Sequence, residues 1–154
     1  MDILPMLAAD LPAVLALNQG ALDGVGPLDA DRLEWITSLD GRALVANDNG
    51  GLAGFVITLR PGTPYDSINY RWFEERYDNH TYLDRVVIAP DYRRTGLGSR
   101  LYDAIESDSS GPVTLEVYVV PPNGVSLAFH RSRGYDEVGR LEQSNGKVAA
   151  LFAK

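Results

Sequence analysis

The sequence predicts one α/β (α+β) domain over residues 1–154, built on a mixed, mostly antiparallel twisted sheet of six to seven strands with helices on both faces. Two observations support this fold class. The 154 residues are the size of one domain, and no internal repeat, low-complexity tract or linker divides them. Strand patterns come first as a hairpin and then alternate with helical patterns, which favours a mixed sheet covered on two sides.

In the first third of the chain, residues 3–7 form the first predicted strand. Asp10 and Asp29 each precede a helical pattern, over residues 11–18 and 30–39. Aspartate is a favoured N-cap, because its carboxylate accepts a hydrogen bond from a free backbone N–H of the first turn. We therefore expect two short helices before the hairpin.

The hairpin is the clearest local signal. Residues 42–47 and 52–59 are apolar runs around an Asn-Gly pair at 49–50, and Asn-Gly supplies the positive φ angles of a tight turn. Residues 65–80 follow, rich in aromatic and acidic side chains, with one short predicted helix over residues 70–77. A long segment without regular structure is usually functional or disordered, and the aromatic residues argue against disorder.

Strands and helices alternate in the second half of the chain. Apolar, β-branched runs bounded by turn residues predict the strands, and apolar residues at helical spacing predict the helices. Gly134 supplies the left-handed residue that follows many helices, and an Asn-Gly pair at 145–146 marks a second hairpin turn. The predicted strands cover residues 83–88, 113–120, 138–141 and 148–152, and the predicted helices cover residues 99–108 and 125–133.

Composition excludes several classes of function. The formal net charge is −7 and the isoelectric point is about 4.7. Nucleic acids and anionic membranes are therefore not expected partners, because proteins bind both through positive charge, whereas cationic partners are attracted. The absence of cysteine excludes a disulfide scaffold, a Cys-ligated zinc or iron–sulfur site and a cysteine nucleophile. No metal site is predicted.

The first residues of the chain lack the basic region and long apolar core of a signal peptide. No apolar run approaches the ~18 residues that a membrane-spanning helix needs. The expected location is the cytoplasm.

The strongest functional signal is a strand, a glycine-containing turn and a helix in succession. Gly96 and Gly98 allow the backbone to approach a ligand closely, and Arg93 and Arg94 add positive charge. Unpaired N–H groups at the start of the helix favour a phosphate group there. The turn is not a Walker A loop, since no Gly-Lys-Ser/Thr follows it, nor a dinucleotide fingerprint, since the third glycine is missing. A solvated basic turn is the alternative interpretation.

The same turn, Arg93-x-x-Gly96-x-Gly98, resembles the acetyl-CoA-binding motif of the GNAT acetyltransferases. A second block lies one helix and one strand downstream and resembles another element of that family. Its residues are Asn123-x-x-Ser126-x-x-Phe129-His130-x-x-x-Gly134-Tyr135. With the order of the earlier elements, the resemblance covers nearly the whole chain. It implies a single GNAT-like domain that transfers an acetyl group from acetyl-CoA (CoA) to an amine acceptor.

The resemblance also implies where the cofactor lies. Main-chain groups of the strand would bind the pantetheine arm, and one N–H would face the thioester carbonyl as an oxyanion donor. The turn would hold the pyrophosphate, and the second block would line the cofactor channel. The implied cofactor-binding residues are Val86, Val87, Ile88, Arg93, Arg94, Thr95, Gly96, Leu97, Gly98, Ser99, Asn123, Ser126 and Phe129.

Acetyl transfer needs a base, because an amine with a pKa near ~10 is protonated at neutral pH. Glu116 lies at a strand position where some family members place a glutamate base, and Asp84 is its rival; a surface carboxylate is the alternative interpretation of Glu116. His130 stands where the family usually has a tyrosine that protonates the departing CoA. The resemblance implies that His130 is the acid, with Tyr118 and Tyr135 as substitutes, or that it is a helix-surface histidine.

Residues 65–82 occupy a part of the chain where family members often build their acceptor pocket. The predicted acceptor-binding residues are Trp72, Tyr77, Tyr82 and Tyr118. The mixture of aromatic and acidic side chains favours a small cationic or aromatic amine, through carboxylate pairing and cation–π contact. The alternative is that Trp72 and Tyr77 belong to the apolar face of a short helix.

Two further alternatives stay open. A noncatalytic acyl-CoA-binding sensor or protein-interaction module on the same scaffold would share both motifs, and the departure from the family pattern at His130 keeps this second hypothesis open. No residue pattern decides between a monomer and a homodimer.

Overall fold

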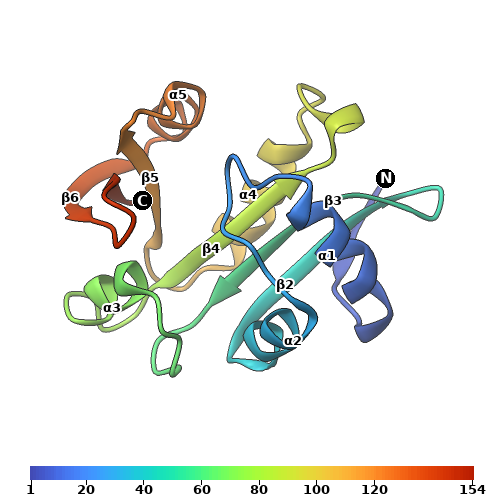
Figure 1. Ribbon diagram of the computed structural model, residues 1–154, viewed down its shortest axis with the longest axis horizontal. Coiled ribbons are helices and arrows are strands. Elements are labelled where there is room, and N and C mark those ends of the chain that lie inside the picture. The colour runs from blue at the N-terminus through green and yellow to red at the C-terminus, as the bar shows by residue number, and fades with distance from the viewer.

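The computed structural model describes residues 1–154 and contains one seven-stranded sheet (Figure 1). The strand order is β1-β2-β3-β4-β5-β7-β6, and every neighbouring pair is antiparallel except β4 and β5. The predicted mixed, mostly antiparallel sheet is confirmed. The strands are β1 (Asp2–Pro5), β2 (Gly41–Asp48), β3 (Gly51–Leu59), β4 (Thr81–Ile88), β5 (Val113–Val120), β6 (Asp136–Glu142) and β7 (Val148–Ala153).

Helices cover both faces of the sheet, as predicted. One hydrophobic core contains residues such as Val14, Ile36 and Phe73 from the first three helices, and a second contains Leu101 and Leu127 from the last two. Figure 1 shows α1 and α2 in front of the sheet and α4 behind it. The helices are α1 (Leu11–Gln19), α2 (Ala30–Ser38), α3 (Ile68–Glu74), α4 (Leu97–Asp108) and α5 (Gly124–Ser132), with short 3₁₀ turns η1 (Ala8–Asp10) and η2 (Pro90–Tyr92).

The two central strands, β4 and β5, separate after a short contact. Their register pairs only Thr81 with Val113 and Tyr82 with Thr114, whereas β4 stays paired with β3 up to Ile88 on its other side. The sheet is therefore continuous at one end and open at the other, and Figure 1 shows β5 turning away from β4. We call the space between the diverging strands the wedge.

The closed end of the wedge is tightly packed. The Thr81 N–H donates a hydrogen bond to the Pro112 carbonyl at 2.9 Å, and the buried His80 ring contacts the Thr114 hydroxyl at 3.0 Å. Gly111 lies so close to Asn79 that a Cβ atom there would stand 2.4 Å from the Asn79 carbonyl oxygen. These contacts fix the point from which the two strands diverge.

Local turn and cap signals have mixed outcomes. Asn49 and Gly50 have φ angles of 50° and 82°, which confirms the hairpin turn. Asp29 caps α2, because its carboxylate accepts the backbone N–H three residues later at 2.7 Å. The prediction that Asp10 caps α1 is wrong: its carboxylate accepts the Leu7 N–H at 2.7 Å and closes the 3₁₀ turn η1 instead.

Element boundaries shift where a cap or turn competes with apolar spacing. The helix expected over residues 99–108 begins at Leu97, because Gly96 adopts a left-handed φ of 86° and starts it. The helix expected over residues 70–77 spans Ile68–Glu74, because the Ser67 hydroxyl caps it. The first strand ends at Pro5 rather than at residue 7.

The packing at Gly111 gives a test of how the wedge is held. We expect Gly111→Ala to lower the free energy of unfolding by ~1–3 kcal/mol, because the new methyl group overlaps backbone atoms that cannot rotate away. Chemical denaturation measures the change. Gly26→Ala is the matched control, since nothing lies within 4 Å of a Cβ atom at Gly26. Equal stability of the two variants would contradict this account of the closed end.

Candidate functional site

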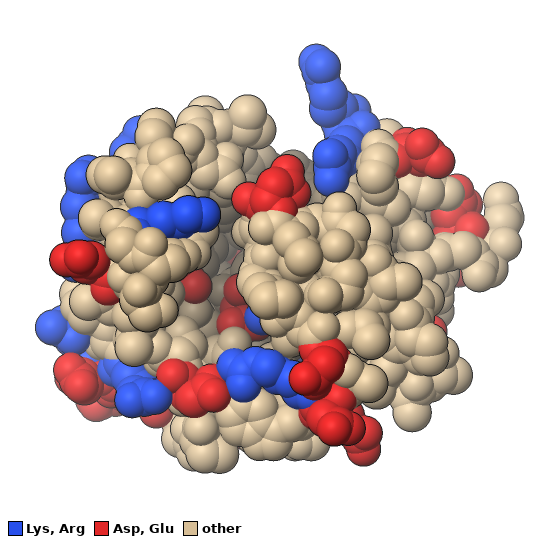
Figure 2. Space-filling view, in the orientation of Figure 1, with Lys and Arg blue, Asp and Glu red and all other residues tan.

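The wedge opens into two connected cavities. One, which we call the polar cavity, has a volume of about 410 Å³, and the other, which we call the groove, has a volume of about 660 Å³. Figure 2 shows this face of the molecule hollowed between its two halves, with acidic atoms inside the hollow. Both cavities are lined by the same eight residues where they meet: Asp23, Gly24, Val25, Asp84, Arg85, Glu116, Asn123 and Ser126.

The groove follows the free edge of β4 and the loop after it. Its wall is formed by residues 86–88, by Arg93 and Arg94, and by Gly96 and Gly98 at the start of α4. No acidic residue lies in the first turn of α4, so the unpaired N–H groups there keep their partial positive charge. This end of the groove is suited to an anionic group such as a phosphate.

Two residues of the loop point elsewhere. The Thr95 hydroxyl donates a hydrogen bond to the Tyr92 carbonyl at 2.5 Å, and the Leu97 side chain is buried in the hydrophobic core. Neither side chain lines the groove. Their contribution to a ligand is therefore limited to main-chain groups.

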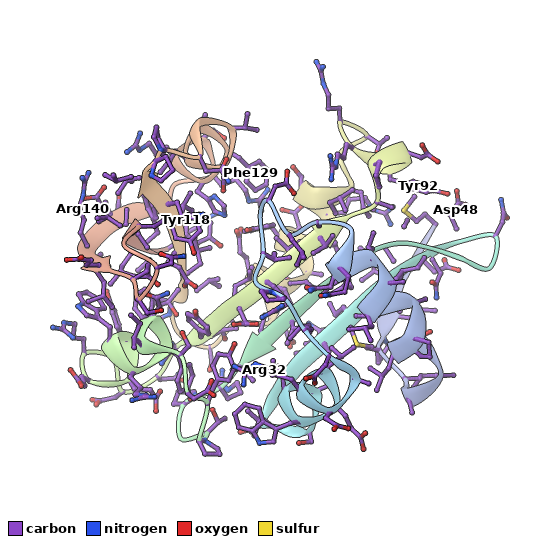
Figure 3. The ribbon with its side chains drawn as sticks, in the orientation of Figure 1. Arg32, Asp48, Tyr92, Tyr118, Phe129 and Arg140 are labelled. Carbon is purple, nitrogen blue, oxygen red and sulfur yellow. The ribbon has the colours of Figure 1, made fainter.

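Helix α5 forms the opposite wall of the groove. Asn123 caps this helix by accepting the Ser126 N–H at 3.2 Å, and Ser126, Phe129 and the exposed Val125 line the groove. Figure 3 shows Phe129 on the β5 side of the wedge and Tyr92 on the β4 side. The two motifs of the sequence therefore face each other across one channel.

Glu116 lies where the groove and the polar cavity meet. The hydroxyl of the fully buried Tyr82 donates to its carboxylate, 2.8 Å from each oxygen. Burial raises the pKa of Glu116 to about 8, and the negative charge of Asp84 adds to this effect while the Tyr82 hydrogen bond opposes it. A carboxylate with this pKa can accept a proton near neutral pH.

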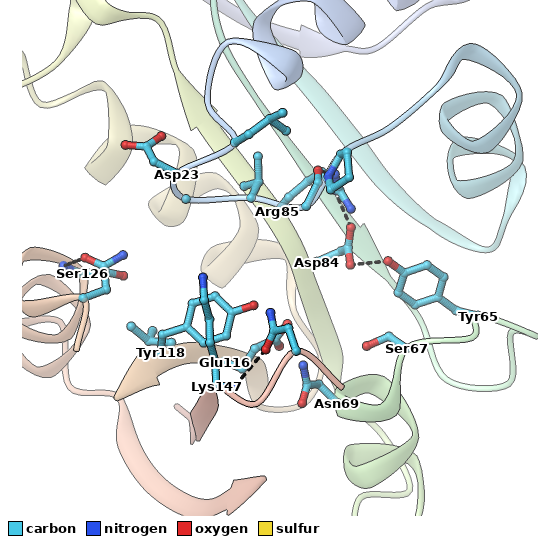
Figure 4. Close-up of a pocket in the computed structure, with 18 residues that line it drawn as sticks. Asp23, Tyr65, Ser67, Asn69, Asp84, Arg85, Glu116, Tyr118, Ser126 and Lys147 are labelled. Atoms are coloured by element: carbon cyan, nitrogen blue, oxygen red, sulfur yellow. Dashed lines mark hydrogen bonds and ion pairs between the residues drawn. The ribbon is translucent and has the colours of Figure 1, made fainter. Parts of the chain in front are cut away.

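Asp84, the rival carboxylate, is already occupied. The Tyr65 hydroxyl donates to it at 2.5 Å, and Arg85 donates through Nε at 2.7 Å in an ion pair whose side chains are 8% and 5% exposed. Arg85 also donates through Nη1 to the Asn18 side chain and to the Gly26 carbonyl, each at 3.0 Å. The pair therefore holds the loop after α1 over the polar cavity (Figure 4).

His130 lines the groove but has no free N–H. Its Nδ1 lies 2.7 Å from the Ser126 carbonyl oxygen, which only accepts, so Nδ1 carries the proton. Its Nε2 then accepts the Tyr102 hydroxyl at 2.6 Å. Burial lowers the pKa of His130, which favours this neutral form. The ring therefore acts on the groove only through Tyr102, which also lines it.

Of the predicted acceptor-binding residues, Tyr118 lines the polar cavity, whereas Tyr82 lies beneath Glu116. Trp72 and Tyr77 lie outside both cavities. Trp72 packs against Gly139, where a Cβ atom would be 2.5 Å from the indole, and Arg76 stacks on its ring. The structure thus gives Trp72 and Tyr77 the alternative role, as packing residues of the α3 segment.

The sequence reasoning missed several lining residues. The polar cavity is also lined by residues 22–27, Tyr65, Asn69 and Lys147, which come from loops and from the start of α3, far apart in the chain (Figure 4). One signal was present: Asp84 and Arg85 are adjacent charges within an otherwise apolar strand, a pattern that indicates a buried ion pair. The turn with Lys147 carries no comparable signal.

Comparisons with solved structures agree with this architecture. The ribosomal-protein-S18-alanine N-acetyltransferase from Escherichia coli superposes with a TM-score of 0.72 at 22% identity, over 99% of this chain and 91% of that chain. NAA60 from Arabidopsis thaliana, in complex with acetyl-CoA, superposes with a TM-score of 0.76 at 16% identity, over 99% of this chain and 97% of that chain. The aminoglycoside 6′-N-acetyltransferase from Enterococcus faecium superposes with a TM-score of 0.72 at 17% identity, over 100% of this chain and 96% of that chain. At these identities the likeness concerns the fold.

A comparison with curated protein sequences gives no match. None of the helices is long and apolar enough to cross a membrane. The sequence itself matches the model of the Acetyltransferase (GNAT) family over residues 13–135, a range that contains the groove loop, Glu116 and the whole of α5. The chain therefore belongs to the GNAT acetyltransferase family.

Proposed function

We propose that this protein is an N-acetyltransferase that moves the acetyl group of acetyl-CoA directly to a primary amine. The observation that carries the proposal is the meeting of the groove and the polar cavity at Glu116, between the separated strands β4 and β5. A cofactor in one cavity and an amine in the other would meet beside a carboxylate that accepts protons near neutral pH.

Acetyl-CoA fits the groove by charge and shape. The start of α4, with Arg93 and Arg94, would hold the pyrophosphate. The main chain of residues 86–88, which has no strand partner on the wedge side, would bind the pantetheine arm, and one of its N–H groups would stabilise the oxyanion. Asn123, Ser126 and Phe129 would enclose the arm from α5.

Glu116 is the proposed base. It takes a proton from the ammonium group of the acceptor, and the neutral nitrogen attacks the thioester carbonyl carbon. The new N–C bond forms, the C–S bond breaks, and CoA leaves as its thiolate, while the second proton that the acceptor nitrogen must lose passes to water in the open wedge. Asp84 is less suited, because its carboxylate already binds Tyr65 and Arg85. His130, expected as the acid, is better assigned as a positioning residue for the Tyr102 hydroxyl.

The polar cavity favours a small cationic amine over an aromatic one. Only 5 of its 18 lining residues are hydrophobic, and the expected aromatic contacts Trp72 and Tyr77 lie outside it. The two tyrosines in its lining are already engaged by protein groups, because the Tyr65 hydroxyl donates to Asp84 and the Tyr118 ring lies under the Lys147 ammonium group.

The groove assignment predicts the effect of Gly98→Trp. Nothing lies within 4 Å of a Cβ atom at Gly98, so the indole enters the groove without disturbing the core. We expect CoA affinity to fall at least about tenfold, measured as loss of the thermal stabilisation by CoA. Ser107→Trp, at an exposed position of the same helix, is the control and should keep that stabilisation. Equal stabilisation of both variants would refute the groove as the cofactor site.

The base assignment predicts a change in pH dependence. The kcat/KM of the wild type should rise with pH until Glu116 loses its proton near pH 8. Glu116→Gln should lower kcat/KM by ~10²-fold or more and remove that rise, as measured by thiol release between pH 6 and 9. A variant with the wild-type pH profile would shift the role of base to Asp84 or water.

If the protein binds CoA and no amine acceptor releases thiol, the chain is a CoA-binding module instead of an enzyme.

The same substitution has a stability signature. The pKa of Glu116 is higher in the folded chain than in the unfolded chain, so the folded state holds the proton more tightly. The associated stability is complete below about pH 4.5 and is lost as the pH rises to about 8. Glu116→Gln avoids this loss. We expect the free energy of unfolding of the variant to exceed that of the wild type by up to about 5 kcal/mol at pH 8. At pH 4.5 the two free energies of unfolding should differ less. Denaturation at both pH values measures the difference.

A further inference from the structure

The chain has two lysines, and one of them lies in the polar cavity. Lys154 is paired with Glu106 at 2.8 Å, away from the wedge. Lys147, on the turn between β6 and β7, forms no ion pair within the protein. Its ammonium group lies over the Tyr118 ring, 4.9 Å from the centroid, and Figure 4 shows the side chain pointing into the cavity. Lys147 is therefore a solvent-exposed cation that lines the cavity and has no anionic partner within the protein.

The other charges of the polar cavity do not supply that partner. Arg85 and Asp84 neutralise each other, and Arg85 gives further hydrogen bonds to Asn18 and Gly26. Glu116 binds the Tyr82 hydroxyl, and Asp23 stands on the exposed loop above. The cavity thus offers acidic groups beside the groove and one unpaired cation on the hairpin side.

The walls that carry these charges are fixed to the rest of the protein. The side chains of Asn69 and Gln143 exchange two hydrogen bonds of 3.0 Å each, which tie α3 to the strand end before the Lys147 turn. On the other side, Arg85 holds the Gly26 carbonyl of the covering loop. At about 410 Å³, the cavity is at the low end of the ~300–1,000 Å³ of ligand pockets. A compact ligand suits it better than an extended one.

We propose that the acceptor is a small amino acid-type compound, which carries a carboxylate as well as the amine. The carboxylate pairs with Lys147 on Tyr118, and the amine lies beside Glu116, where it receives the acetyl group. This inference rests on the proposed acetyltransferase function and deepens it. The arrangement discriminates against diamines, because their second ammonium group would stand against Lys147.

Matched acceptors test the inference. We would measure thiol release with α-, β- and γ-amino acids and with the amide of each, for the wild type, Lys147→Met, Lys147→Glu and Lys147→Arg. The amine of an amino acid amide is less basic than the amine of the amino acid itself, so a larger fraction of it is neutral and able to attack. Basicity alone therefore favours the amide, and a preference for the acid reports recognition of the carboxylate. For the wild type we expect kcat/KM to be at least tenfold higher with the acid than with the amide. This preference should be lost in Lys147→Met, reversed in Lys147→Glu and partly retained in Lys147→Arg. Lys154→Met is the control and should keep it.

A binding measurement separates this inference from the proposed function. Thermal stabilisation by N-acetyl amino acids and by their amides, each with and without CoA, requires no catalysis. Stabilisation by the acids that disappears in Lys147→Met supports the carboxylate site even if no amine releases thiol, in which case the proposed transfer fails alone. Equal use or equal binding of acids and amides by the wild type would overturn the inference. An unchanged preference in Lys147→Met would overturn it as well.

Discussion

The separation of β4 and β5 is the constraint on which the rest of the site depends. Two parallel strands that pair at only two positions leave backbone N–H and C=O groups without a partner, which is costly unless water or a ligand binds them. Each strand is held in place by its other neighbour, β3 or β7. The opening is therefore stable without a ligand, and both cavities are consequences of it.

The charges around this opening have opposite signs at its two ends. Arg93, Arg94 and the start of α4 make one end of the groove positive, although the chain as a whole carries −7. Asp23 makes the junction acidic, and Glu116 adds negative charge there as the pH rises toward its pKa of about 8. A molecule with a pyrophosphate at one end and an acyl group at the other is oriented by this difference, and a protonated amine is drawn toward the acyl group.

Sequence reasoning predicted features that depend on local backbone chemistry. The Asn49-Gly50 turn, the Asp29 cap and the glycines of the groove loop each act through neighbouring residues, so spacing alone revealed them. Asp10 was misassigned because a 3₁₀ turn competed for the same carboxylate. Tyr65 and Lys147 are brought together only by the fold, and Trp72 has the composition of a binding residue but packs against Gly139. These roles depend on distant contacts, which no local pattern encodes.

The absence of a free N–H on His130, the expected acid, follows from the same physical rule that suits Glu116 to its proposed role as the base. Burial disfavours charge, so it keeps His130 neutral and bound to Tyr102 while it raises the pKa of Glu116 to about 8. A thiol has a pKa of ~8.5. In the proposed reaction, the proton that Glu116 takes from the amine can therefore pass to the thiolate, or to water in the open wedge, at little cost in free energy. With the pKa values of base and leaving group this close, a dedicated acid adds little, which is why a histidine without a free N–H is compatible with transfer.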